Sequence, residues 1–125
     1  MINDKWLMMR ENIVKQKSKL FAVRIVRLYQ YLTDTKKEYV LSKQLLRSGT
    51  SVGAMMHESE HAETKKDFIH KTSIAQKEIN ETIYWLDLLK ETDYLSQEQF
   101  ESMNNDAIEL LKLITSIIKT AKTNS

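Results

Sequence analysis

The chain has 125 residues, which is enough for one domain whose hydrophobic core needs no disulfide or metal to hold it together. It contains two glycines and no proline, which disfavours the many tight turns of a β-sandwich or barrel, and no cysteine, which excludes disulfides and thiolate metal sites. The net charge is only +2. We therefore expect an all-α fold in which residues 1–125 form a single domain, an antiparallel four-helix bundle connected up-down-up-down.

The first predicted helix spans residues 5–32, where apolar side chains recur every three or four residues, the spacing of one helix face. Its expected inner face is Val14, Ser18, Phe21, Ile25, Leu28 and Leu32. A polar turn follows, in which Thr35 and Glu38 are spaced to form a capping box for the second helix, predicted over residues 38–62. Its expected inner face is Leu41, Leu45, Gly49, Val52 and Met56. A glycine inside a helix costs about 1 kcal/mol, so Gly49 and Gly53 predict a close approach by a neighbouring helix.

The third helix is predicted over residues 65–91, with Thr64 as its N-cap and Asp67 three residues later. Its expected inner face is Phe68, Thr72, Ala75, Ile79, Thr82, Leu86 and Leu89. The fourth follows Ser96, which Gln99 complements in a capping box, and extends to about residue 122. Its expected inner face is Phe100, Met103, Ala107, Leu110, Ile114, Ile117 and Ala121.

The third helix carries a second apolar face, away from the core face. It contains Ile74, Trp85 and Leu88. An exposed patch with a tryptophan is typical of an interface, so we expect these three residues to mediate self-association. The alternative is that Trp85 lies along the shoulder of the bundle, since scattered exposed apolar residues are ordinary.

His57-Glu58-Ser59-Glu60-His61 matches the H-E-x-x-H pattern of zinc peptidases. Both histidines fall on the face opposite the buried residues of the second helix, and no third ligand follows at a recognised spacing. Serines of this helix have no adjacent base, and the core faces hold no carboxylates for a di-iron site. We therefore expect no catalytic residue, no bound metal and no cofactor, which makes the protein non-enzymatic.

The charge is distributed unevenly along the chain. Residues 1–47 carry 11 Lys/Arg against 4 Asp/Glu, a balance of +7, whereas residues 48–125 carry 8 against 13, a balance of −5. We expect the first two helices to form a basic surface that binds an anionic partner, with phosphate contacts from cations and stacking from an aromatic ring. Its candidate residues are Lys17, Arg24, Arg27, Tyr31, Lys43 and Arg47, beside Lys36 and Lys37 in the turn. The alternatives are an ordinary solvated helix face and ion pairing with the acidic half.

Four stretches resemble one known family. The run Arg47-Ser48-Gly49-Thr50-Ser51-Val52-Gly53-Ala54, followed by Glu58, resembles the second-helix signature of the four-helix bundle proteins of 23S rRNA intervening sequences. Residues 21–26, 66–69 and 74–86 resemble further parts of that family. Where the family usually has Asn after Gly-Ala, this chain has Met55, so it cannot make any interaction that depends on that amide.

The resemblance implies a compact antiparallel bundle that assembles as a homopentamer. It also implies kinship with the Avd accessory protein of diversity-generating retroelements, a basic pentamer that binds nucleic acid and a reverse transcriptase. It supplies no catalytic residues.

Two functions are consistent with these observations, and a metal-dependent hydrolase that uses His57, Glu58 and His61 is a third, disfavoured alternative. The first is an oligomeric nucleic-acid-binding protein, with structured RNA as the expected ligand. The second is a scaffold or accessory subunit whose basic surface docks an acidic protein. No stretch approaches the roughly 18 apolar residues of a membrane span, and the start lacks a signal-peptide core, so we expect a cytoplasmic protein with no membrane partner.

Overall fold

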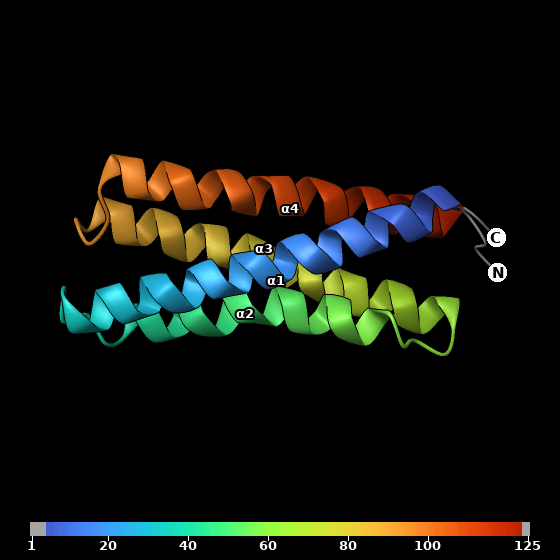
Figure 1. Ribbon diagram of the computed structural model, residues 1–125, viewed down its shortest axis with the longest axis horizontal. Helices are drawn as coiled ribbons and strands as arrows, with labels where there is room; N and C mark the ends of the chain where they lie inside the picture. The colour runs from blue at the N-terminus through green and yellow to red at the C-terminus, as the bar shows by residue number, and fades with distance from the viewer. Residues whose placement is uncertain (1–4, 124–125) are drawn as a thin grey trace.

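The computed structural model describes residues 5–123, which form four α-helices. The helices are α1 (Lys5–Asp34), α2 (Leu41–Ser59), α3 (Lys65–Glu91) and α4 (Gln97–Thr123). They run side by side along the long axis of the molecule, and α1 begins at the end where α4 finishes (Figure 1). Each helix packs against its two neighbours in the order α1, α2, α3, α4 and back to α1, so that α1 and α3 lie diagonally opposite. The antiparallel four-helix bundle expected from the sequence is confirmed.

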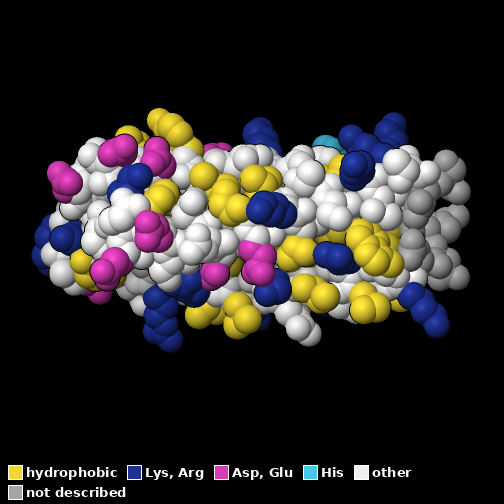
Figure 2. Space-filling view, turned by 90° about the horizontal axis from the view of Figure 1, so that it is seen from above, with side chains coloured by type: hydrophobic (Ala, Val, Ile, Leu, Met, Phe, Trp, Pro, Cys, Tyr) yellow, Lys and Arg dark blue, Asp and Glu magenta, His cyan; other side chains and the backbone are white. Residues whose placement is uncertain are grey.

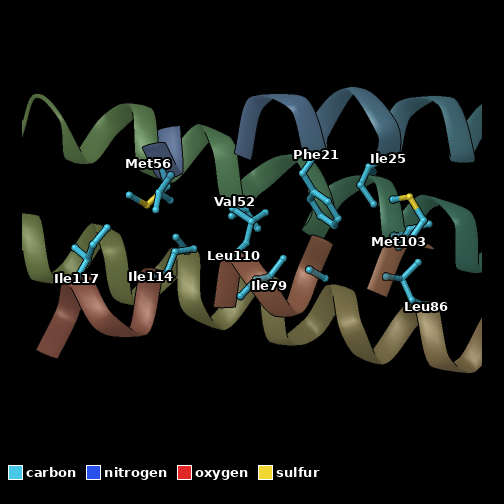
Figure 3. Close-up of a cluster of buried hydrophobic side chains, with 14 of the residues drawn as sticks. Phe21, Ile25, Val52, Met56, Ile79, Leu86, Met103, Leu110, Ile114 and Ile117 are labelled. Carbon is cyan, nitrogen blue, oxygen red and sulfur yellow. The ribbon is translucent and has the colours of Figure 1, made fainter. Parts of the chain in front are cut away.

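The core lies along the bundle axis and receives side chains from all four helices (Figure 3). Phe21 and Ile25 of α1 face Val52 of α2 and Ile79 of α3, and each is almost completely buried. The predicted inner faces are confirmed, apart from four positions that are half-buried and pack against the edge of the core. These are Leu28, Leu41, Phe68 and Phe100. The period of three and four residues therefore identifies the buried face of every helix.

α1 and α2 approach each other closely at the two glycines. A Cβ atom added to Gly49 would lie 2.7–2.9 Å from three side-chain atoms of Ile25, and one added to Gly53 would lie 3.3 Å from the backbone oxygen of Ser18. Contacts below 3.0 Å are not tolerated without a shift of the neighbour. The glycines therefore let α1 approach α2 directly, as the sequence predicts.

α2, α3 and α4 each have a side-chain cap at the N-terminus, but the cap of α2 is not the expected one. Thr64 accepts a hydrogen bond from Asp67 N at 3.0 Å, and Ser96 and Gln99 bond each other's backbone N–H at 3.1 and 2.9 Å, so both predicted caps are confirmed. The Thr35–Glu38 box is wrong. The backbone N–H of Thr35 instead donates to Tyr31 O and closes the end of α1.

Glu38 itself caps α2 from outside the helix. Its carboxylate accepts the backbone N–H groups of Val40, Leu41 and Ser42, at 3.1, 2.9 and 2.6 Å, and its side chain is buried. The carboxylate thus occupies the N-terminal end of the helix dipole, and α2 begins three residues later than predicted. At the other end α2 stops at Ser59 rather than near residue 62.

Replacing Gly49 by Ala is expected to destabilise the protein by about 1 kcal/mol. The new methyl group overpacks against Ile25, at a cost of about 1–3 kcal/mol, and regains only about 1 kcal/mol from helix propensity. Urea unfolding gives the free energy. In an Ile25→Ala background the obstructing atoms are gone, so the same Gly49→Ala change should become stabilising. An equal loss in both backgrounds would show that the contact with Ile25 does not explain the glycine.

Replacing Glu38 by Gln is expected to cost about 1–2 kcal/mol of unfolding free energy at neutral pH, because one acceptor oxygen becomes a donor facing backbone N–H groups. Burial alone would raise the pKa of Glu38, but the hydrogen bonds from the backbone of Leu41, Ser42 and Val40 outweigh it and hold that pKa below its ordinary value. The stabilisation is therefore present above about pH 4.3, the unfolded value, and is lost as the pH falls through the folded-state pKa.

Urea unfolding of the wild type and of Glu38→Gln across this range tests the cap. The gap in stability between them should shrink as the pH falls below about 4. Glu63→Gln, which changes an exposed glutamate in the α2–α3 turn, is the matched control. Its free energy of unfolding should equal that of the wild type at every pH. A gap that stays constant into acid would contradict a charged cap at Glu38.

Candidate nucleic-acid interface

The structure pairs two of the predicted phosphate-binding cations with carboxylates of α4. Lys17 Nζ lies 3.2 Å from Glu109 Oε1, and Arg24 binds the Asp106 carboxylate. Arg24 also donates to the hydroxyl and the backbone oxygen of Ser102, at 2.7 and 3.2 Å. These pairs are partly exposed, so each contributes about 0–1 kcal/mol to stability. These ion pairs matter more for binding than for stability, because a polyanion approaching this flank of α1 would compete with carboxylates of the same chain.

Arg27 and Tyr31 lie on the same flank of α1, in different environments. Arg27 is exposed at the edge of an open groove between α1 and the start of α4, with Val23, Glu98 and Ser102. Tyr31 is half-buried and packs against the hydrophobic core, so only part of its ring is accessible to a base.

The remaining two candidates point outward from α2. Lys43 and Arg47 are exposed and one helical turn apart, opposite the buried Leu45. Lys36 and Lys37, in the α1–α2 turn that leads into this helix, are exposed as well. Among the described residues 5–123, no carboxylate lies within ion-pair distance of any of these four cations. We call Lys36, Lys37, Lys43 and Arg47 the α2 basic face.

The six candidates lie in two groups, one on α1 and one on α2. Lys17, Arg24, Arg27 and Tyr31 lie on the flank of α1 that faces α4, whereas Lys43 and Arg47 belong to the α2 basic face. Figure 2, which looks onto the α4 side, shows Lys and Arg interspersed with hydrophobic side chains there, and Asp and Glu gathered towards one end.

One basic residue that sequence reasoning missed adds to the outward surface of α1. Lys19 is exposed and lies one turn after Lys15, which reaches across to the Glu60 carboxylate just beyond α2. The hydrogen bond from Lys15, opposed by partial desolvation, lowers the pKa of Glu60, so that this carboxylate stays charged. Lys15 is therefore neutralised, whereas among residues 5–123 no carboxylate lies within ion-pair distance of Lys19. Their spacing of four residues in the sequence is enough to place Lys15 and Lys19 on one edge of the helix. It does not show which of the two lysines forms an ion pair.

The histidine motif spans the last turn of α2 and the turn that follows it, and both histidines are exposed. His61 lies beyond the end of α2, and its ring meets that of His57 edge to face at a centroid distance of 5.6 Å. Glu58 pairs with Lys71 at 3.0 Å, and this contact raises the pKa of Lys71. Within residues 5–123 no three His, Asp or Glu side chains are grouped as a metal site would require.

A small cavity of about 170 Å³ opens near the α2–α3 turn, between Leu7 and Phe68. Glu11, Glu60 and Glu63 line it. Burial of Glu11 raises its pKa, and the nearby charge of Glu60 raises it further. Among residues 5–123, Lys65 is the one cation that lines it, so the lining of this cavity is mainly acidic and apolar.

The predicted interface residues of α3 are half-buried rather than fully exposed. Trp85 packs against the edge of the core, donates its indole N–H to Glu81 at 3.2 Å and stacks edge to face on Tyr84. Ile74 and Leu88 are half-buried too. The exposed apolar side chains that the sequence pattern did not single out are concentrated on α1, where Leu20 and Met9 are 66% and 63% exposed.

With this geometry established, the comparisons with known proteins are decisive for the family. The family described as 23S rRNA-intervening sequence protein matches residues 10–116. The chain belongs to this family. The resemblance drawn from the residues is therefore confirmed, and the match to the family extends it to parts of all four helices.

A solved structure supports the same assignment. The chain is 57% identical to a protein of unknown function from the S23 ribosomal protein family of Bacteroides thetaiotaomicron, over 88% of this chain and 98% of the other, with a TM-score of 0.87. A comparison with curated proteins finds no match. Among residues 5–123, none of the helices is both long and apolar enough to cross a membrane.

Family membership gives the signature of α2 a structural meaning in this 23S rRNA-intervening sequence protein. Gly49 and Gly53 fall at the close approach to α1, and Ser48 makes a buried hydrogen bond of 3.0 Å with Thr82 of α3. Met55, at the position where an amide was expected, is half-buried and packs against the core. The residues of the signature are therefore those through which α2 packs against α1 and α3.

Proposed function

We propose that this protein is a non-enzymatic RNA-binding bundle that acts in the cytoplasm and contacts phosphates through the α2 basic face. The observation that carries the proposal is the set of four cations on that face with no carboxylate within ion-pair distance among residues 5–123. Unpaired surface cations can release condensed counterions from a polyanion at no cost in broken ion pairs. The family description, which refers to intervening sequences of 23S rRNA, supports RNA as the polyanion.

The composition of this face favours recognition of the backbone over recognition of bases. Three of its four residues are lysines, which act as point charges on phosphate, and Arg47 can bind two phosphate oxygens at once. Tyr31, the one aromatic candidate for stacking, lies on the other side of α1 and is half-buried. We therefore expect binding that depends on the shape and charge of a structured RNA more than on its sequence.

Reversing the charge of the face should abolish most of this binding. The double variant Lys43→Glu/Arg47→Glu is expected to weaken binding to a structured RNA hairpin by tenfold or more at low salt. It should also reduce the slope of log affinity against log salt by about 0.7–0.9 for each phosphate that the protein no longer binds. Fluorescence anisotropy over a salt series measures both quantities.

Lys112→Glu/Lys119→Glu is the matched control, because it makes the same change in net charge at two exposed lysines of α4. It should lower the affinity by the smaller amount expected from net charge alone and leave the slope nearly unchanged. If the two double variants weaken binding equally, the α2 basic face is not the binding site. If the wild type binds no RNA and copurifies with one stoichiometric acidic protein, the face docks a protein.

The paired cations provide a second comparison. Lys17→Gln/Arg24→Gln removes two positive charges that Glu109 and Asp106 already neutralise. We expect a smaller loss of RNA affinity than for removal of Lys43 and Arg47 by the same Gln substitutions. A larger loss would move the interface to the α1–α4 flank.

A further inference from the structure

The turn between α1 and α2 presents an exposed tyrosine that the sequence reasoning did not single out. Tyr39 is 53% exposed and lies at the end of the bundle opposite to the start of α1 (Figure 1). Among residues 5–123, its ring stacks on no other aromatic ring, lies beneath no cation and does not pack against the hydrophobic core. The ring therefore offers a surface on which another planar group can stack.

The backbone on both sides of Tyr39 is held by hydrogen bonds. Before it, the N–H of Glu38 donates to Leu32 O at 2.9 Å, and after it, the N–H of Val40 donates to the Glu38 carboxylate at 3.1 Å. Lys37 has a positive φ of 57°, which reverses the chain between the two helices. Because the turn is already ordered, a ligand of Tyr39 would have little backbone to immobilise.

The cations of the α2 basic face surround Tyr39 along the chain. Lys36 and Lys37 precede it, and Lys43 follows it by four residues. An extended chain advances at most about 3.6 Å per residue, so the Cα atom of Tyr39 lies within about 14 Å of the Cα atoms of all three lysines. Arg47 lies one helical turn beyond Lys43. A strand whose phosphates contact these cations would therefore carry its bases past the tyrosine.

The N-terminus of α2 does not compete for the phosphates. A helix N-terminus ordinarily attracts anions through its free N–H groups. Here the carboxylate of Glu38 already accepts the N–H groups of Val40, Leu41 and Ser42. The cationic side chains are thus the phosphate-binding groups of this region, and Tyr39 is the group suited to a base.

Negative charge restricts the approach of a polyanion at this end of the bundle to the α2 side. Exposed carboxylates belong to the turn before α4 and to its first residues, namely Asp93, Glu98 and Glu101. Figure 2, which looks onto the α4 side, shows Asp and Glu gathered at this end. Since α4 lies diagonally opposite α2, these carboxylates repel RNA from the far side of the bundle and leave Tyr39 on the accessible side.

We propose that Tyr39 stacks on an unpaired base of the RNA whose phosphates the α2 basic face contacts. The ligand class is therefore a structured RNA with unpaired nucleotides beside its stem, as in a hairpin loop or a bulge. This inference rests on the proposed function and adds a base contact to it. Stacking accepts any base, because every base has a π-face, so the contact selects unpaired RNA without reading its sequence. A fully paired stem keeps its base faces inside the helix and cannot make the contact.

Two hairpins with the same stem and the same phosphates test the contact. One has an unpaired loop, and the other has abasic riboses in that loop. By fluorescence anisotropy, the wild type should bind the intact loop about five- to 150-fold more tightly than the abasic loop, which is the usual range for one stacked base. Tyr39→Leu, which keeps apolar bulk but removes the ring, should erase this preference. Tyr39→Phe should retain it.

Two controls separate stacking from charge and from misfolding. Tyr39→Leu should leave the slope of log affinity against log salt unchanged, because no phosphate contact is lost, whereas Lys43→Glu/Arg47→Glu reduces that slope. Tyr84→Leu changes a tyrosine of α3 that is 57% exposed, and it should leave the affinity for both hairpins unchanged. Helical circular dichroism should be the same for all of these variants.

The failure of this inference differs from the failure of RNA binding. If the wild type binds both hairpins equally and Lys43→Glu/Arg47→Glu weakens both, the α2 basic face binds RNA and the stacking by Tyr39 is wrong. If Tyr39→Leu keeps the preference for the intact loop, the base contact lies elsewhere and the inference is overturned. If the wild type binds neither hairpin, the proposed function fails and the inference fails with it.

A membrane surface is the other anionic partner that this turn could meet, since Val40 beside Tyr39 is 71% exposed. Two apolar side chains offer a small area for insertion into a bilayer, which proteins achieve with the apolar face of an amphipathic helix or with a lipid anchor. Cosedimentation with vesicles that contain phosphatidylserine measures this alternative. Binding to the vesicles but to neither hairpin, lost in Tyr39→Leu, would overturn the inference.

Discussion

The packing of Gly49 against Ile25 is the constraint on which the arrangement of the bundle depends. The side chain of Ile25 occupies the space that any Cβ at position 49 would need. The close approach at Gly49 and Gly53 fixes the rotation of α1 about its own axis, because only one face of α1 can enter so narrow a gap. The directions in which the remaining faces of α1 point are then fixed as well.

That rotation determines what becomes of the positive charge. With Ile25 turned towards α2, Arg24 is carried to the opposite flank, where it meets Asp106 and Ser102 of α4. Lys17 reaches Glu109 for the same reason. The acidic second half of the chain thus neutralises part of the basic first half inside one protomer. Among residues 5–123, the cations of that half with no carboxylate within ion-pair distance are those of the α2 basic face and, on α1, Lys5, Arg10, Lys19 and Arg27.

The sequence predicted the buried face of each helix because hydrophobic burial follows a period that is visible in one dimension. It predicted the caps of α3 and α4 because those hydrogen bonds join residues three apart. It misplaced the start of α2. Glu38 lies before the helix and caps it with its side-chain carboxylate, whereas a capping box would place Glu38 inside the first turn, and both arrangements fit the same sequence spacing. It also grouped five cations and Tyr31 as one candidate surface. Which of them meets a carboxylate depends on the contact between α1 and α4, residues about 80 positions apart in the case of Arg24 and Asp106. No local pattern encodes that contact.

The buried apolar face of α1 and its exposed apolar residues, such as Leu20 and Val23, have a consequence for how this helix can change in sequence. One inserted or deleted residue turns everything that follows it by about 100° around the axis. Such a change near the middle of α1 would misalign the face that packs inside the bundle and the outward stripe containing Leu20 together. Most surface helices tolerate such a rotation of their outer face, because polar side chains are solvated equally well in any order. In α1, the buried apolar residues and the exposed apolar residues both recur every three or four positions. Variation in length should therefore be confined to the turns that connect the helices.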